Sequence, residues 1–225
     1  MRTKYHLPLH EEHYYHVYNR AVTKARLFYR SRNYHYFMDR WVRHIDPFCD
    51  LLAYCLIPNH FHFVIRVKRV DDQILDIIHS MSSKASKAYL NGDIAYFVFL
   101  ESQFQRYFLG HALHIKKQEK RNGALFQKGF KRVLIKSERQ LVRTISYVHH
   151  NPIHHQLAPE YDTWKYSSYQ SYLKASSSLV STNRFFELLS FDPDVAPRKQ
   201  FIAHHEEYRI GFNPKWRVKD QVVFE

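Results

Sequence analysis

Cysteine, long apolar runs and acidic side chains are all scarce in this sequence. The two cysteines, Cys49 and Cys55, are too few and too close for a disulfide framework, so we expect buried thiols. No apolar run is long enough to span a bilayer, and the polar segment 1–12 does not resemble a secretory signal. We therefore expect a globular cytoplasmic protein with no membrane partner.

Basic residues outnumber acidic ones, and this excess indicates what kind of molecule the protein binds. The chain has 34 Lys and Arg against 21 Asp and Glu, a net charge of +13. Such an excess favours a polyanion, because Lys and Arg bound to phosphates release condensed counterions. Aromatic residues make up 16% of the chain, and exposed rings can stack on unpaired bases. The composition favours single-stranded nucleic acid, although a basic enzyme of another kind would fit it too.

The apolar patterns predict alternating strands and helices over most of the chain. Ser137 is a candidate N-cap with Gln140 three residues on, and we expect the helix that follows to stop before Pro152. The order indicates an α+β sandwich with helices over an antiparallel sheet. The expected strands are 14–19, 51–57, 60–67 and 131–136, and the expected helices are 33–45, 71–90 (weakly), 101–117 and 138–151.

We expect two regions of unequal size. Residues 1–175 would form the main, catalytic domain. A serine-rich linker at 176–178 would follow, and residues 176–225 would form a helical C-terminal appendage. The chain shows no internal repeat.

His60 and His62 are two apart in a predicted strand that follows the turn pair Pro58-Asn59. Side chains at this spacing leave the same face roughly 7 Å apart, so two imidazoles could converge on one metal ion. Phe61 and Phe63 would anchor the other face in the core. With 17 histidines in the chain, about one such pair is expected by chance, so the spacing alone is weak evidence.

Tyr147 and Asn151 are four apart on a predicted helix and share a face that points away from its apolar residues. If that face meets the histidine pair, Asn151 can supply an oxygen ligand while Tyr147 lies beside the metal. A divalent ion could then orient a phosphate for attack by the phenol. The alternative is an ordinary tyrosine near a helix end.

A second histidine cluster ends the same helix. It comprises His149, His150, His154 and His155. A zinc site would need a cysteine or acidic partner at matching spacing, and none is present. We therefore expect solvated histidines near DNA phosphates, with His150 close enough to Tyr147 to help move its proton.

Four motifs occur in order along the chain: YHVYNR at 15–20, AYCLIPNHFH at 53–62, RNGALFQ at 121–127 and YVHHNP at 147–152. Together they resemble the motifs of the single-tyrosine HUH transposases, and most closely those of the REP-associated tyrosine transposases of bacteria. A trailing segment, 164–169, is similar to the end of that group, and the resemblance covers about residues 14–172. One departure is the stretch 71–100, which is longer and more apolar than the family pattern.

The resemblance implies a ferredoxin-like antiparallel sheet with helices on one face. It also implies Mg²⁺- or Mn²⁺-dependent cleavage of single-stranded DNA near a hairpin, through a 5′-phosphotyrosine intermediate that leaves a free 3′-hydroxyl. Carried over by position, His60 and His62 are the paired metal ligands, Tyr147 is the nucleophile and Asn151 is the third ligand. Such an enzyme would be associated with the nucleoid. Whether Tyr147 serves its own metal site or that of a partner in a homodimer stays open.

DNA contacts are expected in or beside the matched motifs. Candidates for phosphate binding are Arg20, Arg121, Lys128, Lys131 and Arg132, and candidates for base stacking are Phe126 and Trp164. Solvated charges and core rings are the alternative at each position. Two further functions stay open: a hairpin-binding protein that has lost catalysis, and a zinc hydrolase, which lacks an acidic base beside the histidine pair.

Overall fold

The computed structural model describes residues 7–22, 25–174, 179–189 and 194–212. The predicted linker at 176–178 therefore lies outside the described residues, as do residues 213–225 of the predicted appendage. Within the described ranges, no helix combines the length and apolarity needed to cross a bilayer.

Strands and helices alternate along the chain much as the apolar patterns predict. The strands are β1 (Tyr14–Arg20), β2 (Cys49–Ile57), β3 (His60–Val67) and β4 (Lys131–Ile135). The helices are α1 (Ser31–His44), α2 (Asp72–Ser80), α3 (Lys84–Leu90), α4 (Tyr96–Gln118), α5 (Glu138–His154), the 3-10 turn η1 (Tyr161–Thr163), α6 (Tyr169–Lys174), α7 (Asn183–Leu189) and α8 (Pro197–Ile210).

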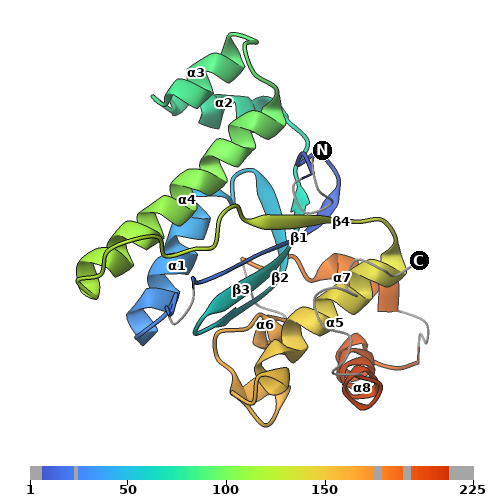
Figure 1. Cartoon of the computed structure of the whole chain (residues 1–225). Helices are drawn as coiled ribbons and strands as arrows, with labels where there is room; N and C mark the ends of the chain where they lie inside the picture. Colours follow the sequence, from blue (N-terminus) through green and yellow to red (C-terminus); the bar gives the residue numbers. More distant parts are fainter. Residues whose placement is uncertain (1–6, 23–24, 175–178, 190–193, 213–225) are drawn as a thin grey trace.

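The four strands form one sheet in the order β2-β3-β1-β4, and every neighbouring pair is antiparallel. Helix α1 connects β1 to β2, and α4 connects β3 to β4, so the chain makes two strand–helix–strand units whose strands interleave. Both connecting helices lie on the same side of the sheet (Figure 1). The predicted α+β class and ferredoxin-like sheet are confirmed.

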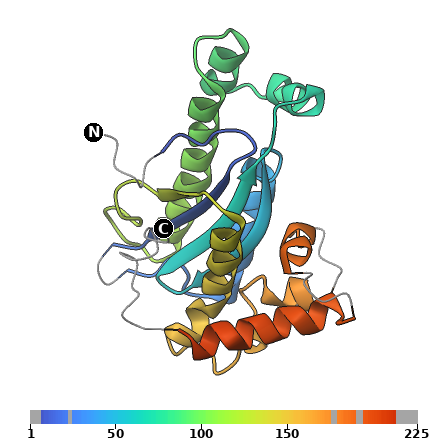
Figure 2. The same ribbon diagram turned by 90° about the vertical axis from the view of Figure 1, so that its right-hand side faces the viewer.

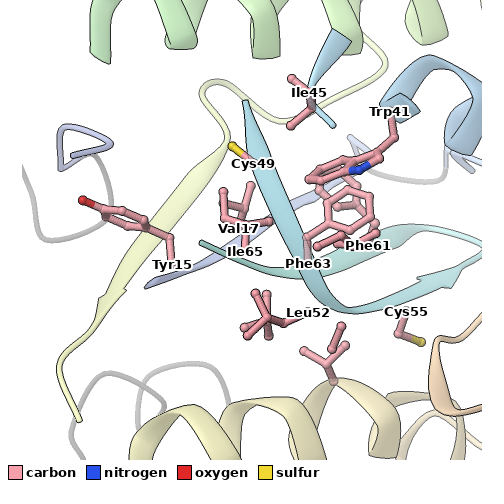
Figure 3. Close-up of a cluster of buried hydrophobic side chains, with 14 of the residues drawn as sticks. Tyr15, Val17, Trp41, Ile45, Cys49, Leu52, Cys55, Phe61, Phe63 and Ile65 are labelled. Atoms are coloured by element: carbon pink, nitrogen blue, oxygen red, sulfur yellow. The ribbon is translucent and has the colours of Figure 1, made fainter. Parts of the chain in front are cut away.

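Aromatic side chains fill the layer between the sheet and these two helices. Phe61 and Phe63 leave β3 on this face and are fully buried. The ring of Phe63 lies 4.5 Å from that of Trp41 on α1 (Figure 3). The ring of Phe61 lies 5.2 Å from that of Phe37, also on α1. Since successive residues of a strand point to opposite faces, this anchoring aims His60 and His62 at the other face.

Helix α5 covers that other face, over β2 and β3 (Figures 1 and 2). The resemblance implied helices on one face of the sheet only. The structure differs: α1 and α4 cover one face, and α5 covers the other. Ile145 and Val148 of α5 are fully buried, as is Cys55 of β2, so apolar side chains line this layer as well. A sheet with apolar side chains on both faces must be covered on both.

The described part of the predicted appendage packs into the same hydrophobic cluster as the sheet. Phe201 of α8 is fully buried, and its ring stacks on Tyr172 at 4.9 Å. The backbone N–H of Ser181 donates to the carbonyl of Leu51 in β2, 2.8 Å away. Helices α7 and α8 thus extend the layer on the α5 side.

The long stretch after β3 forms two helices where one weak helix was predicted. They are divided at Met81–Ser83, where the Ser83 hydroxyl caps α3 by accepting from the N–H of Ser86 at 3.0 Å. Helix α4 begins at Tyr96, earlier than expected, and α2 and α3 lie by its first turns, away from α5 (Figure 1).

Candidate active site

The histidine pair lies at the start of β3, on the face that α5 covers. His60 and His62 are 8% and 2% exposed, and their ring centroids are 5.1 Å apart with planes at 84°. The expected same-face arrangement is confirmed by the pairing of β3 with β1, in which His62 lies opposite Tyr18 and His60 opposite Arg20. The two imidazoles therefore lie next to each other with nearly perpendicular planes.

A hydrogen bond at Nδ1 orients each of the two rings. Nδ1 of His60 lies 2.8 Å from the amide oxygen of Asn59, which can only accept, so this nitrogen carries the ring proton. Nδ1 of His62 lies 2.8 Å from Nε2 of His16, and with the proton on Nδ1 this bond holds the ring from behind. In both rings Nε2 then keeps a free lone pair, the arrangement found in metal-ligating histidines. Nε2 of His62 is buried and has no hydrogen-bond partner.

Burial lowers the pKa of both histidines. The pKa of His60 falls to about 3, mainly through burial, with smaller effects of His155 and Arg20, while the nearby Asn151 side chain opposes the shift. Burial also takes the pKa of His62 well below its usual value, with His16 and His60 acting in the same direction. Both imidazoles are therefore neutral at neutral pH, as ligation of a metal requires.

The start of α5 follows from its sequence. The Ser137 hydroxyl accepts from the N–H of Gln140 at 3.2 Å, and the Gln140 side chain accepts from the N–H of Lys136 at 2.7 Å. The predicted N-cap is confirmed, while the glutamine reaches one residue further back than in a capping box. The predicted stop before Pro152 is wrong: α5 runs to His154. A proline there removes only the hydrogen bond that its own N–H would have made, in the last helical turn.

Tyr147 and Asn151 face the histidine pair from α5. The ring centroid of Tyr147 lies 5.4 Å from that of His62 and 6.0 Å from that of His16, edge to face in both cases. Asn151 is fully buried, and its Nδ2 donates to the carbonyl of Tyr147 at 2.9 Å. Its Oδ1 is buried without a hydrogen-bond partner. The structure therefore brings together, within one chain, all four residues on which the predicted chemistry depends.

The donor set fits part of a coordination sphere. His60 and His62 offer neutral nitrogens, and Asn151 offers an amide oxygen that nothing else occupies. Mn²⁺ and Mg²⁺ accept such oxygens and take further ligands from phosphates and water. Among the described residues, no group of three or more His, Cys, Asp or Glu side chains could hold a metal ion. An ion here would therefore depend on the amide and on oxygens of the substrate.

Two of the predicted DNA-binding cations lie close to this site. Arg20 is exposed at the end of β1, and its charge contributes to the lowered pKa of His60. The ammonium of Lys131 lies 5.6 Å from the ring centroid of Tyr18, and that ring stacks at 5.6 Å on His62. Both cations therefore lie near the histidine pair, and their phosphate contacts stay a prediction.

The other three predicted cations are placed differently. Arg132 is 6% exposed, and its guanidinium pairs with Glu101 and with the carbonyl of Leu7. This position speaks against the predicted phosphate contact, since the side chain points away from the α5 face. Arg121 donates to the carbonyl of Ala124 at 3.1 Å and shapes its own loop. Lys128 is exposed in the loop before β4.

The two rings predicted to stack on bases are partly buried and pack against the core. Phe126 packs in the aromatic layer, 5.4 Å from the ring of Phe108 and 6.3 Å from that of Phe61. The indole N–H of Trp164 donates to the carbonyl of Leu56 at 3.0 Å, which ties the chain after α5 to β2. Both rings thus take part in the packing of the fold, and base stacking by their exposed parts stays a prediction.

The second histidine cluster is not uniformly solvated as expected. His149 is fully buried between His205, 2.9 Å from its Nδ1, and the hydroxyl of Ser168, 2.8 Å from its Nε2. His150 is 4% exposed, and its Nδ1 lies 3.1 Å from the hydroxyl of Tyr161, so this nitrogen is engaged away from Tyr147. The described helix α8 supplies the cover that the sequence pattern did not reveal.

Three residues of the site were missed by sequence reasoning. His16 and Asn59 orient the two ligand rings, and His155 lies with its ring 4.8 Å from that of His60. His16 and Asn59 both lie inside matched motifs. Period-two alternation in β1 places His16 on the same face as Tyr18, but only strand pairing brings that face to His62.

The comparisons with known proteins agree with the motifs. No family model matches the chain. It is similar to a putative REP-associated tyrosine transposase of Haemophilus influenzae, with 24% identity over 131 residues, which cover 57% of this chain. The chain spans 63% of the length of that relative. The resemblance to the REP-associated tyrosine transposases is thus confirmed by a named relative. A solved structure of a REP-associated tyrosine transposase bound to a REP hairpin is 12% identical, with a TM-score of 0.48 and coverage of 79% of this chain and 88% of that one.

Proposed function

We propose that this chain is a transposase-type enzyme that cuts and rejoins single-stranded DNA at hairpin sites, with Tyr147 as the nucleophile and Mg²⁺ or Mn²⁺ as the cofactor. The observation that carries the proposal is the meeting of Tyr147 and Asn151 with His60 and His62, where two buried ligand atoms lack any hydrogen-bond partner. The likeness to a relative named as a REP-associated tyrosine transposase supports it.

The residues of this chain divide the work. His60, His62 and Asn151 would hold the ion, which supplies charge that polarises a non-bridging phosphate oxygen. The fixed Nδ1 bonds to Asn59 and His16 keep both imidazoles aimed at it, so no ring must reorient when the DNA arrives.

Tyr147 carries the covalent step. Its phenol oxygen attacks the phosphorus, a phosphorus–oxygen bond forms, and the bond from phosphorus to the 3′ oxygen of the preceding nucleotide breaks. The phenol proton passes to solvent, and the departing 3′ oxygen takes a proton from solvent. Attack of a 3′-hydroxyl on the phosphotyrosine runs the same exchange in reverse and joins a strand.

The direct test is covalent trapping. The chain is incubated with labelled single-stranded hairpin oligonucleotides from flanking genomic DNA, with Mn²⁺, Mg²⁺ or EDTA, and adducts are resolved on denaturing gels. We expect an adduct with either ion, none in EDTA and none with Tyr147→Phe. Tyr36→Phe is the matched control, because Tyr36 lies on α1, on the far side of the sheet, with its ring on His114. An adduct with Tyr147→Phe would refute the choice of nucleophile. Tight binding without any adduct would favour the silent hairpin-binding alternative.

A further inference from the structure

One face of α5 carries a stripe of three side chains over the start of β3. Tyr147 and Asn151 lie four residues apart on α5, and His155, four residues further, is its C-cap, so the three follow one another along this side of the helix. The ring of Tyr147 lies beside His62, 5.4 Å away, and that of His155 lies beside His60, 4.8 Å away. The metal-binding atoms therefore have the nucleophile on one side and the end of α5 on the other.

An open pocket of about 590 Å³ lies next to His60, because two contacts of that ring, Asn59 and His155, line the pocket. Four segments build it: the end of β1 and the chain after it, the β2–β3 turn, the loop before β4 and the end of α5. Its polar lining includes Arg20, Arg26, Asn59, Gln127 and His155. Two of these border the metal site directly, since Asn59 bonds to His60 and His155 packs on its ring.

Backbone hydrogen bonds hold these walls together. The N–H of Gln127 donates to the carbonyl of Arg20 at 2.8 Å, and the N–H of Ala21 donates to the carbonyl of Asn59 at 2.8 Å. The N–H of Leu27 donates to the carbonyl of Pro58 at 2.7 Å. These bonds connect the described walls of the pocket, and its volume lies in the range of about 300–1,000 Å³ that accepts a small ligand.

The proposed reaction indicates which part of the DNA would occupy this pocket. In an in-line displacement at phosphorus, the leaving oxygen departs on the side opposite the nucleophile. With the phosphate at the metal-binding atoms and Tyr147 beside His62, the departing 3′ oxygen points towards the His60 side. We propose that this pocket binds the nucleotide on the 5′ side of the cut, the one released with the free 3′-hydroxyl, and selects its base.

The chemistry of the lining suits a nucleotide, and this inference rests on the proposed function. Arg20 and Arg26 are exposed cations that can pair with the next phosphate upstream. Gln127 carries an exposed amide, which can donate and accept at once and so can distinguish base edges. The ring of His155 offers a flat surface for stacking.

The test uses one library of single-stranded hairpin oligonucleotides with randomised flanks. The native chain cuts the library with Mn²⁺ and the products are sequenced, while the uncut library is selected for binding to the Tyr147→Phe chain. We expect a base preference at the nucleotide 5′ of the cut that Gln127→Ala weakens about tenfold, with no change at other positions. Arg26→Ala should weaken binding for all sequences alike and reduce its salt dependence. Gln105→Ala on α4 and Arg43→Ala on α1 are matched controls, since both side chains are exposed on helices across the sheet.

The outcomes separate this inference from the proposed function. Two results would overturn the pocket assignment alone. In the first, Gln127→Ala cuts DNA with an unchanged base preference at the nucleotide 5′ of the cut. In the second, Gln127→Ala loses base preference only at a nucleotide 3′ of the cut. If no oligonucleotide forms an adduct, the proposed function fails. The binding selection then still decides the pocket: a preference at one flank position that Gln127→Ala removes supports a nucleotide site, and its absence refutes one.

Discussion

Replacing Asn151 by leucine should stabilise the metal-free protein while weakening its stabilisation by metal. The buried Oδ1 of Asn151 has no hydrogen-bond partner, and such an atom costs about 1–3 kcal/mol. Leucine removes that cost and gives up the Nδ2 bond to the carbonyl of Tyr147, worth about 1 kcal/mol, while the carbonyl keeps its helical partner. We expect the free energy of unfolding in EDTA to rise by about 1 kcal/mol.

The response to metal is the second half of the prediction. An ion that binds only the folded chain stabilises it by about 2.7 kcal/mol at a concentration 100 times its dissociation constant. Native protein should gain stability as Mn²⁺ is raised, and Asn151→Leu should gain much less. Urea unfolding followed by tryptophan fluorescence, in EDTA and in Mn²⁺, measures both quantities.

Asn33 provides a matched control, because it is also fully buried but is fully paired. Its Oδ1 accepts from the N–H groups of Tyr29 and Arg30 at 3.0 and 2.9 Å, and its Nδ2 donates to Gln118 at 2.9 Å. Asn33→Leu should therefore lose about 3 kcal/mol. The reasoning is refuted if Asn151→Leu loses as much as Asn33→Leu in EDTA, or if it keeps the full stabilisation by Mn²⁺.

Three further predictions concern positioning, an ion pair and pH. His16→Phe should keep the fold but weaken Mn²⁺ binding about 10- to 100-fold, because His62 loses the partner that orients it; calorimetry showing native affinity would contradict this role. Arg132→Ala should lower the free energy of unfolding, measured in urea, by about 3 kcal/mol, because it leaves Glu101 unpaired. It should leave the salt dependence of DNA binding unchanged; a weaker salt dependence would show that Arg132 does contact a phosphate. Burial and His149 hold the pKa of His205 well below its usual value near 6.5, so its contribution to stability is complete above pH 6.5 and is lost as the pH falls below that. The free energy of unfolding should therefore decrease towards pH 4, and a His205→Phe variant with an unchanged decrease would show that other groups cause it.

The sequence by itself determined the order of strands and helices, the basic charge and the face on which each site residue emerges. The faces follow from local periodicity. A spacing of two residues places His60 and His62 on the same face of β3, and a spacing of four residues places Tyr147 and Asn151 on the same face of α5. The family motifs named these four residues, and the structure brings them to one point. Their catalytic roles stay predictions.

Only the tertiary structure decided what lies opposite each face. Periodicity does not say that α5 packs over the face of β3 that bears the histidines, that His16 reaches His62 from 46 residues away, or that α8 buries His149. Nor could it place Arg132 against Glu101, because a cation beside a DNA-binding motif looks the same in sequence whether it meets solvent or a buried carboxylate. Such contacts join segments that are distant in the chain. Which of them form depends on which helices pack on each face of the sheet.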